Sequence, residues 1–380
     1  MPRPISAEFS AAALTHNLNR VRQHVLDAAN AARARGESVA PPAIWAVIKA
    51  NAYGHGIERA VKAFSGAQGL AMLDFAEAIR CREAGWGGPI LMLEGFFEPA
   101  DIEWLERYHL TTVIHCDEQL AMLARARVSR RIGCFVKLNS GMNRLGFAQA
   151  DYSDAFARAQ GLQKKGVLGQ IGKMTHFANA DGEAGIDAQM MAFTEATQKL
   201  PGMVSVCNSA ATWRFPEVSL APEGQTSWVR PGICLYGSSP FDDCSAESLD
   251  LRPAMTLSSR IIGVQTVSAQ AGVGYGSRYR ASRAMRVGVV ACGYADGYPR
   301  HAEDGTPVMV CGRRTQLIGR VSMDMLMVDL SHHPEADVGS PVVLWGNGGP
   351  SVDEVARHSG TIGYELLCAV APRVPRRDIA

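Results

Sequence analysis

Hydrophobic and polar residues follow two successive rhythms along this chain. Residues 11–35, rich in Ala, Arg and Asn, have the period of a helix, and after them short apolar runs alternate with stretches of helical period. Eight apolar runs have the length of buried strands, at residues 43–48, 70–73, 90–93, 112–115, 132–138, 170–176, 204–207 and 229–236. The helical stretches between them include residues 75–85, 99–108, 118–126, 152–165 and 187–199. Short buried strands separated by helices predict a parallel sheet.

The number of these units indicates a particular α/β architecture. A (β/α)8 TIM barrel needs eight strands and usually about 250 residues, and this region matches both requirements. An open doubly wound sheet is the alternative, and it more often carries a glycine-rich dinucleotide turn after its first strand. No such turn follows residues 43–48, so the pattern favours the barrel.

The pattern changes near Gly237. Residues 238–253 are rich in Ser, Asp and Pro and have the composition of a linker. Beyond them, β-rich runs with Gly turns occupy residues 255–267, 285–293, 307–312, 316–318, 325–330 and 341–345, and residues 352–370 are more helical. We therefore predict a TIM-barrel domain at residues 1–240 and a second, mainly antiparallel β domain at residues 241–380.

Composition narrows the class of protein. Of the 380 residues, 47% are hydrophobic and 20% are charged, as in an ordinary globular protein with a sizeable core. The net charge of +1 gives neither the basic surface expected for nucleic-acid binding nor attraction to an anionic membrane. Nine scattered cysteines, none in a CxxC or CxxH pair, indicate reduced thiols rather than zinc ligands. Because we see no secretion signal and no apolar run of ~18 residues, we expect a cytoplasmic protein.

Polar residues gather where the predicted strands end. In a TIM barrel the chemistry lies at the C-terminal ends of the strands. The residues in this position are Lys49, Lys137, Arg144, His176, Asn208, Ser209, Arg230 and Gly232. Because they follow separate strands, the barrel would bring them together at one mouth.

Lys49 is the most informative of these residues. It follows an apolar run and precedes a segment with glycines on both sides of His55. A lysine that closes a buried strand is costly unless its amine is paired or used covalently. Two interpretations remain open at this point: a rim lysine whose amine reaches water, and a Schiff-base lysine on a rigid element.

The loops after the seventh and eighth strands offer donors for an anion. Phosphate sites of TIM barrels are typically built from these loops. Asn208 and Ser209 offer side chains, and Gly232 and Ile233 offer backbone amides. Ser209 taken alone fits a helix N-cap better. Together with Lys49, the set favours a phosphorylated cofactor.

Nine motifs along nearly the whole chain closely resemble those of the alanine racemases, barrel-type enzymes that use pyridoxal 5′-phosphate (PLP). In the first predicted domain they are AVIKANAYGHG at 46–56, GMNRLG at 141–146, THFA at 175–178, NSA at 208–210 and RPG at 230–232. In the second they are GYG at 274–276, GYADGY at 293–298, GRVSMD at 319–324 and GYE at 363–365. The resemblance implies the racemisation of alanine by a PLP enzyme.

The resemblance also implies roles for the matching residues. Lys49 would hold PLP as a Schiff base and act as one catalytic base, and Tyr275 of the partner subunit would act as the other. Arg230 would hydrogen-bond the pyridine nitrogen, and His176 would lie beside the ring. The phosphate would be held by Tyr53, Asn208, Ser209, Gly232, Ile233 and Tyr364.

Substrate binding and assembly follow from the same resemblance. Arg144 and the Met323 amide would bind the substrate carboxylate. Lys137 matches a family lysine that is often carbamylated and positions Arg144, although Asn139 stands where many relatives carry Asp. Sharing of the two bases between subunits implies a homodimer. The reaction would supply D-alanine for peptidoglycan or serve alanine breakdown.

Other interpretations fit the sequence less well. A decarboxylase or a broader racemase for serine or larger substrates would have the same barrel, but the motifs at 274–276 and 323–324 fit alanine racemases better. A small PLP carrier protein would lack the region from Pro240 to Ala380. The glycines at 272–276 follow no strand–helix unit, so they favour a β-turn over a nucleotide-binding loop. The adjacent residues His332 and His333 fit a solvated loop better than a metal site.

Overall fold

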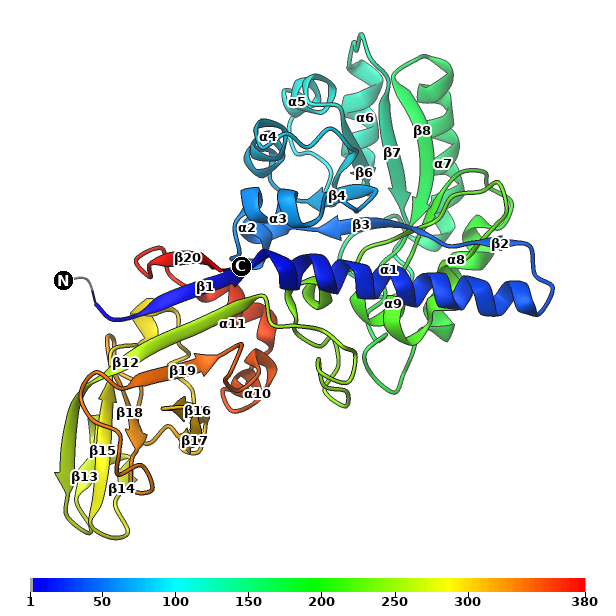
Figure 1. Cartoon of the computed structure of the whole chain (residues 1–380). Helices are drawn as coiled ribbons and strands as arrows, with labels where there is room; N and C mark the ends of the chain where they lie inside the picture. The colour runs from blue at the N-terminus through cyan, green and yellow to red at the C-terminus, as the bar shows by residue number, and fades with distance from the viewer. Residues whose placement is uncertain (1–2, 380) are drawn as a thin grey trace.

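Eight parallel strands form a barrel in the computed structural model, which describes residues 3–379 (Figure 1). In sheet order they are β11 (Trp228–Val229), β3 (Ala43–Val47), β4 (Gly69–Met72), β5 (Ile90–Met92), β6 (Leu110–Ile114), β7 (Ile132–Lys137), β8 (Leu168–Met174) and β9 (Val204–Ser205). A parallel bridge between Val204 and Ser227 joins the two edges. The predicted TIM barrel is therefore confirmed.

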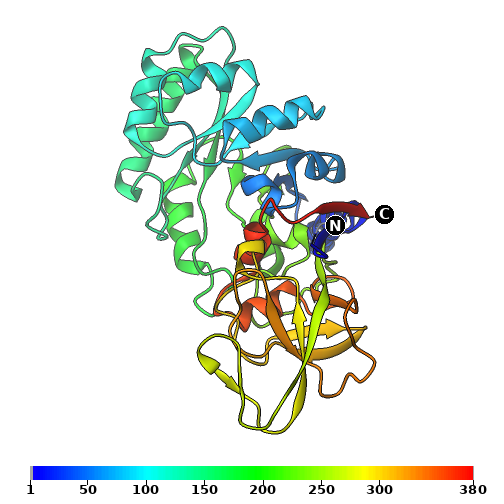
Figure 2. The ribbon, with the colours of Figure 1, turned by 90° about the vertical axis from the view of Figure 1, so that its left-hand side faces the viewer.

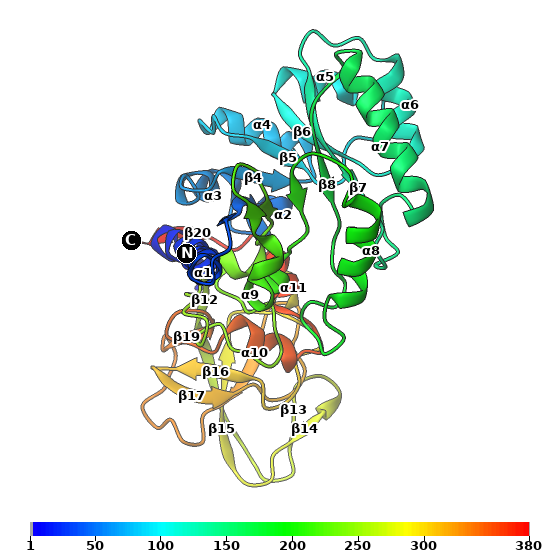
Figure 3. The same ribbon diagram turned by 90° about the vertical axis from the view of Figure 1, so that its right-hand side faces the viewer.

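Helices follow the strands and cover the outside of the barrel (Figure 3). They are α3 (Ile57–Ala63), α4 (Phe75–Glu83), α5 (Asp101–Arg107), α6 (Asp117–Arg125), α7 (Gln149–Lys164), α8 (Asp187–Thr197) and α9 (Ser209–Arg214). The short element α2 (Lys49–Tyr53) is a left-handed turn at the barrel mouth. Because helices cover one face of the sheet and the barrel interior the other, strands such as β4 and β5 are buried at every position. This explains why they form continuous apolar runs in the sequence.

The prediction of a last barrel strand at residues 229–236 is largely wrong. Strand β11 ends at Val229, and Ile233–Tyr236 form a 3-10 helix, η2. Pro231 has no N–H to donate to a sheet ladder, so the strand cannot continue through it. The change of direction places Arg230 and Gly232 at the barrel mouth.

A mainly antiparallel sheet forms the second part of the structure. Its main path runs β17 (Arg313–Gln316), β16 (Pro307–Val310), β19 (Pro341–Trp345), β12 (Met255–Val267), β1 (Ser6–Ser10) and β20 (Arg376–Ile379), and β15 (Met285–Val290) joins β12 to β18 (Leu326–Asp329). Helices α10 (Val352–Arg357) and α11 (Gly363–Ala369) complete this C-terminal β domain. The predicted β-rich character is confirmed.

The two ends of the chain meet in this second sheet. Strand β1 pairs with β12 in antiparallel fashion and with β20 in parallel fashion. Figure 2 shows both termini between the barrel above and the β domain below. Helix α1 (Ala11–Ala34) follows β1 at once, capped by the Ser10 hydroxyl, which accepts from the Ala13 N–H at 3.1 Å.

One continuous apolar core runs through both parts of the molecule. Helix α11 packs against α2 at the barrel mouth, where the Gly54 backbone lies directly against that of Leu367. None of the helices within residues 3–379 has the length and apolar character required to span a membrane.

Candidate active site

A cavity of about 370 Å³ opens at the C-terminal ends of the barrel strands, and we call it the mouth cavity. Its volume suits a small molecule or a cofactor. Predicted residues that line it are Lys49, Tyr53, Lys137, Arg144, His176, Asn208, Ser209, Arg230, Gly232 and Tyr364. All of them come from the barrel except Tyr364, which lies on α11 of the C-terminal β domain.

Three predicted site residues do not line the mouth cavity. Ile233 directly follows Gly232 but is fully buried in η2. Tyr275 and Met323 lie in the C-terminal β domain, with 69% and 54% of their surface exposed. Within one chain, the two residues expected to reach the substrate from the second domain therefore remain outside the cavity.

Lys49 begins a turn of unusual backbone conformation. The next four residues, Ala50 to Tyr53, have φ values of 55°, 52°, 55° and 49°. This left-handed region costs about 1–2 kcal/mol for each residue other than glycine. Such strain persists only where the surroundings impose it, and it concentrates at functional sites. The turn fixes where the Lys49 and Tyr53 side chains leave the backbone.

Two polar side chains of α4 form hydrogen bonds with Asn51 of this turn. The Asn51 N–H donates to the Glu77 carboxylate. The Asn51 side-chain oxygen accepts from the Arg80 guanidinium at 3.2 Å. These bonds tie the strained backbone to a neighbouring helix.

The imidazole of His55 holds the inner side of the same turn. His55 is completely buried, and burial lowers its pKa to about 4, so the ring is neutral at physiological pH. Its Nδ1 lies 3.1 Å from the Ala52 carbonyl oxygen and 2.9 Å from that of Tyr53. Since carbonyls only accept, Nδ1 carries the hydrogen. This explains the histidine between two glycines after Lys49.

The amine of Lys49 lies in cationic surroundings. Burial, and then the charge of Arg144, lower its pKa, while Glu94 opposes the shift. No carboxylate within residues 3–379 forms an ion pair with this amine. A lysine that loses its proton readily is suited to nucleophilic and basic chemistry.

Arg230 is buried without a carboxylate partner. Burial lowers its pKa to about 10, so it remains protonated at neutral pH. Its Nη1 donates to the Ser205 hydroxyl at 2.6 Å, and its Nη2 donates to the Thr175 carbonyl at 2.6 Å. Nη2 also lies 3.4 Å from Nδ1 of His176, whose pKa burial and then Arg230 hold well below its usual range. His176 is therefore a neutral acceptor beside a fixed cation.

Gly232, Ser209 and Tyr53 form a tight corner of the mouth cavity. The Gly232 N–H donates to the Ser209 hydroxyl oxygen at 2.8 Å, which leaves the hydroxyl hydrogen free to donate. A side-chain carbon at Gly232 would lie 2.5 Å from the Tyr53 hydroxyl, so only glycine fits. The Tyr53 ring is in turn stacked on Tyr236 at 4.6 Å between centroids and lies near Tyr364.

Helix α9 begins beside this corner, and Asn208 is its N-cap. The Asn208 side-chain oxygen accepts from the Ala211 N–H at 3.0 Å, and its amide donates to the Phe177 carbonyl at 3.2 Å. Ser209 is thus not the cap, contrary to the alternative considered for it alone. Its hydroxyl faces the corner instead.

Two family models match the chain, the alanine racemase N-terminal domain over residues 9–240 and the alanine racemase C-terminal domain over residues 254–378. The chain belongs to the alanine racemase family. It is 65% identical over 380 residues to a curated alanine racemase of Bordetella petrii and 66% identical over 378 residues to one of Bordetella avium, with both chains fully covered in each case. The family resemblance seen in the sequence is confirmed.

Solved structures agree with this membership. The chain is similar to the biosynthetic alanine racemase of Pseudomonas aeruginosa, with a TM-score of 0.90, 41% identity and full coverage of both chains. It is similar to the alanine racemase of Acinetobacter baumannii, with a TM-score of 0.87, 34% identity, and 99% of this chain and 100% of that chain covered. Membership of the alanine racemase family places the chain among PLP-dependent racemases, a class of isomerases.

Two acidic residues of the mouth cavity were missed in the sequence. Glu94 and Asp181 both line it. Glu94 follows β5 closely, so the strand-end rule that selected Lys49 would have found it. Asp181 lies on a long loop between β8 and α8, and no local pattern marks it.

Lys137 is a buried cation whose neighbours are also cations. Burial, and then the charges of Arg230 and Arg144, lower its pKa from 10.5 to about 8. Between these two pH values the unfolded chain binds a proton that the folded protein lacks, so stability rises with pH in this window. Below pH 8, the buried charge of Lys137 lowers the free energy of unfolding by roughly 3 kcal/mol.

We expect Lys137→Met to stabilise the cofactor-free protein at pH 7 in buffer purged of CO2. The gain over wild type should shrink as the pH rises from about 8 towards 10.5, because wild type then loses the buried charge. Urea unfolding at pH 7 and pH 9.5, followed by tryptophan fluorescence, measures this difference. A stability difference equal at both pH values would contradict the account.

Proposed function

We propose that this chain is an alanine racemase that binds PLP on Lys49 and interconverts L- and D-alanine. The observation that carries the proposal is the mouth cavity. It joins an amine of lowered pKa, a buried guanidinium and a serine–glycine corner in one space. The match of both domains to the alanine racemase family specifies the chemistry that such a site performs.

Three features of the residues present fit PLP. Lys49 offers an amine without an ion pair within residues 3–379. Arg230 uses Nη1 and Nη2 for contacts within the chain, while its Nε finds no acceptor among the described residues. Gly232 lets the Tyr53 hydroxyl approach the backbone beside Ser209, where a side-chain carbon would collide with it. These fit the aldehyde, the pyridine nitrogen and the phosphate, in that order.

Holding the cofactor would involve both domains. Ser209, Gly232, Ile233, Asn208, and the hydroxyls of Tyr53 and Tyr364 would surround the phosphate, with the Ser209 hydroxyl hydrogen free to donate to it. Tyr364 comes from α11, so cofactor binding would clamp the C-terminal β domain to the barrel. When bound, PLP supplies an electron sink for the substrate α-carbon.

Arg230 would set the strength of that sink. A guanidinium only donates hydrogen bonds, and with a pKa of about 10 it keeps its protons at neutral pH. It would therefore leave the pyridine nitrogen unprotonated, whereas a carboxylate there would accept a hydrogen bond from the protonated nitrogen and stabilise that form. A weaker sink favours return of the proton to the α-carbon over side reactions such as transamination.

Racemisation removes the α-proton from one face of the carbon and returns a proton to the other, and the proposed mechanism uses one proton carrier on each face. Lys49 Nζ would take or return the proton on one face, and its lowered pKa favours the neutral amine that this step needs. The Tyr275 hydroxyl of the partner subunit would serve the other face. Arg144 and the Met323 amide of the partner subunit would hold the substrate carboxylate.

A homodimer with shared sites is supported by what the C-terminal β domain leaves exposed. Tyr275, Met323, Tyr294 and Met325 are large side chains with more than a third of their surface exposed. Tyr294 and Met323 are neighbours, since the Ala295 N–H donates to the Met323 carbonyl at 3.0 Å. An exposed apolar patch of this kind is typical of a protein interface. In a twofold dimer it would cover the partner's mouth cavity.

We further propose that Lys137 carries a carbamate. Its lowered pKa leaves part of the amine neutral, as a reaction with CO2 requires. The nitrogen would bond to the carbon of CO2, one oxygen would take the electron pair, and one proton would pass to water. The resulting anion would balance Arg144 and Arg230.

Labelled bicarbonate tests the carbamate. With ¹³C-bicarbonate, we expect the wild-type protein to give a carbamate carbon signal in its NMR spectrum. The signal should be missing in Lys137→Met, which cannot form the bond. A wild-type spectrum identical to that of the variant would contradict the assignment.

Incubation of the purified protein with PLP and L-alanine in D2O tests the proposed function. We expect optical rotation to decay to zero and deuterium to appear at the α-carbon of both enantiomers. Retention of L-alanine without exchange would contradict racemisation. We expect the reaction to occur in the cytoplasm and to provide D-alanine for peptidoglycan or to serve alanine breakdown.

A further inference from the structure

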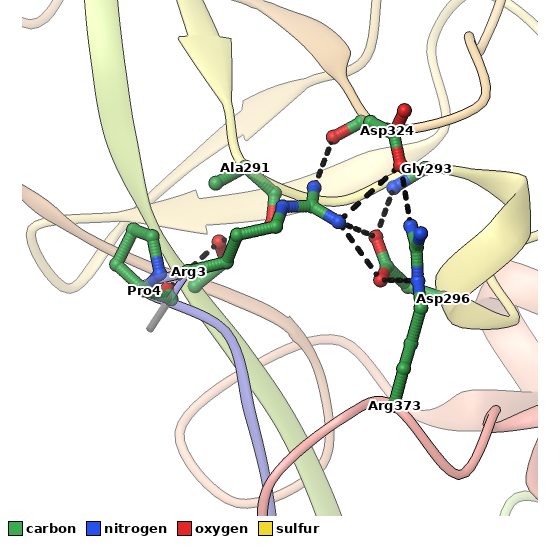
Figure 4. Close-up of polar contacts among 8 residues, drawn as sticks. Arg3, Pro4, Ala291, Gly293, Asp296, Asp324 and Arg373 are labelled. Carbon is green, nitrogen blue, oxygen red and sulfur yellow. Dashed lines mark hydrogen bonds and ion pairs between the residues drawn. The ribbon is translucent and has the colours of Figure 1, made fainter. Parts of the chain in front are cut away.

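Two arginines and two aspartates form an ion cluster in the C-terminal β domain, and we call it the Asp296 cluster: Arg3, Asp296, Asp324 and Arg373 (Figure 4). Asp296 is its centre, with only 1% of its side chain exposed. Arg3 Nη1 donates to its two carboxylate oxygens at 3.1 and 3.2 Å, and Arg373 Nε donates at 2.8 Å. Burial of a carboxylate is costly unless cations and hydrogen-bond donors surround it, as they do here.

The cluster joins segments that are far apart in the sequence. Arg3 precedes β1, and Arg373 precedes β20, so both ends of the chain contribute a cation. Arg373 Nη2 also donates to the Asp324 carboxylate at 2.6 Å, and Arg3 Nη2 donates to the Asp324 backbone carbonyl. Each arginine therefore bridges Asp296 to the loop that contains Asp324.

Asp296 also fixes the turn that supports this loop. Its carboxylate accepts the Gly293 N–H at 3.0 Å. The next two N–H groups of the turn, those of Tyr294 and Ala295, donate at 3.0 Å to the carbonyls of Ser322 and Met323. A side-chain carbon at Gly293 would lie 2.3 Å from the Ser322 carbonyl oxygen, so the two segments are in direct contact.

Loop 322–324 is thus held from two sides, while one of its groups remains free. The Ser322 N–H donates to the Met325 carbonyl at 2.9 Å. The Met323 N–H has no acceptor among residues 3–379, and more than half of the Met323 side chain is exposed. The Met323 N–H can therefore donate a hydrogen bond to an acceptor atom of another molecule.

We propose that Asp296 is a positioning residue for substrate binding, which acts through Arg3 and Arg373 to hold loop 322–324 so that the Met323 amide reaches the substrate carboxylate in the partner subunit's mouth cavity. This inference rests on the proposed function. Asp296 touches neither substrate nor cofactor. Loss of its charge should loosen the loop and weaken ground-state and transition-state binding alike, which raises KM and spares kcat.

Steady-state kinetics of the PLP-loaded Asp296→Asn variant test the proposal. The asparagine amide would face two guanidinium donors and break the cluster. We expect KM for L-alanine to rise roughly tenfold, the effect of losing one hydrogen bond to a charged group. We expect kcat and the dissociation constant of PLP to change less than twofold.

Milder variants separate the effect of Asp296 on loop position from an effect on folding. Arg3→Gln keeps Asp296 and Arg373 and should raise KM about threefold, and Arg3→Lys should lie between it and wild type. Arg314→Gln removes an exposed ion pair with Glu354 in the same domain and should leave KM unchanged. If Asp296→Asn fails to fold, the Arg3 series decides in its place.

Two results would overturn the inference. One is a lower melting temperature with KM unchanged in Asp296→Asn and Arg3→Gln, which would make the cluster a stabiliser only. The other is a fall in kcat or in PLP affinity with KM unchanged. Failure of the proposed function is distinct, because wild type would then show no racemisation before any variant is compared.

Discussion

Lys49→Ala is expected to lower the rate of alanine racemisation by about 10⁴-fold or more, because under the proposed mechanism it would remove both a cofactor anchor and a proton carrier. The variant should fold, since the Lys49 amine makes no ion pair within residues 3–379 and its removal relieves repulsion by Arg144. Borohydride reduction followed by peptide mass spectrometry measures the covalent attachment. Wild type should carry the PLP mass on the peptide that contains Lys49, and the variant should carry none.

Lys173→Met is the matched control for this loss. Lys173 is also a buried barrel lysine of lowered pKa. Its amine does not line the mouth cavity and instead donates a hydrogen bond of 2.6 Å to the Leu200 carbonyl. We expect the control to keep its cofactor and its activity. A PLP adduct that persists in Lys49→Ala would show that another lysine holds the cofactor.

Tyr275→Phe has the second-largest expected effect. Under the proposed mechanism, removal of the hydroxyl would eliminate one of the two proton carriers, and general acid–base groups contribute typically ~10²–10⁴-fold to the rate. Tyr275 is 69% exposed in the single chain, so the change should leave folding and PLP binding intact. The rate of racemisation in both directions, measured by chiral chromatography, should fall by this factor.

Tyr279→Phe serves as the control, because it removes a tyrosine hydroxyl from β14 (Tyr279–Arg280) of the same domain. We expect it to keep wild-type activity. Wild-type rates in Tyr275→Phe would exclude this tyrosine as a base.

The barrel and most of the mouth cavity could be predicted because their signals are local. A buried parallel strand forms a short apolar run, and the residue after it points into the barrel mouth. Lys49, His176 and Arg230 were all found by this rule, and the structure brings them to one cavity. Prediction of strand 229–236 failed because apolar residues after Pro231 fit a buried 3-10 helix as well as a strand.

The rest depends on pairing between distant residues. Strand β1 joins β12 and β20, which are about 250 and 370 positions away in the chain, and nothing local to Ser6–Ser10 marks this pairing. The left-handed turn from Ala50 to Tyr53 contradicts the propensity of its residues and exists because distant groups impose it. The Asp296 cluster, with cations 370 positions apart in the chain, is equally hidden.

We propose that each active site combines Lys49 of one chain with Tyr275 of the partner subunit. Mixing Lys49→Ala chains with Tyr275→Phe chains tests it most directly. Each mixed dimer would contain one cavity with both bases and one with neither. We predict about half the wild-type activity per purified mixed dimer, although both parent dimers are nearly inactive. A verified mixed dimer no more active than its parents would contradict the shared site.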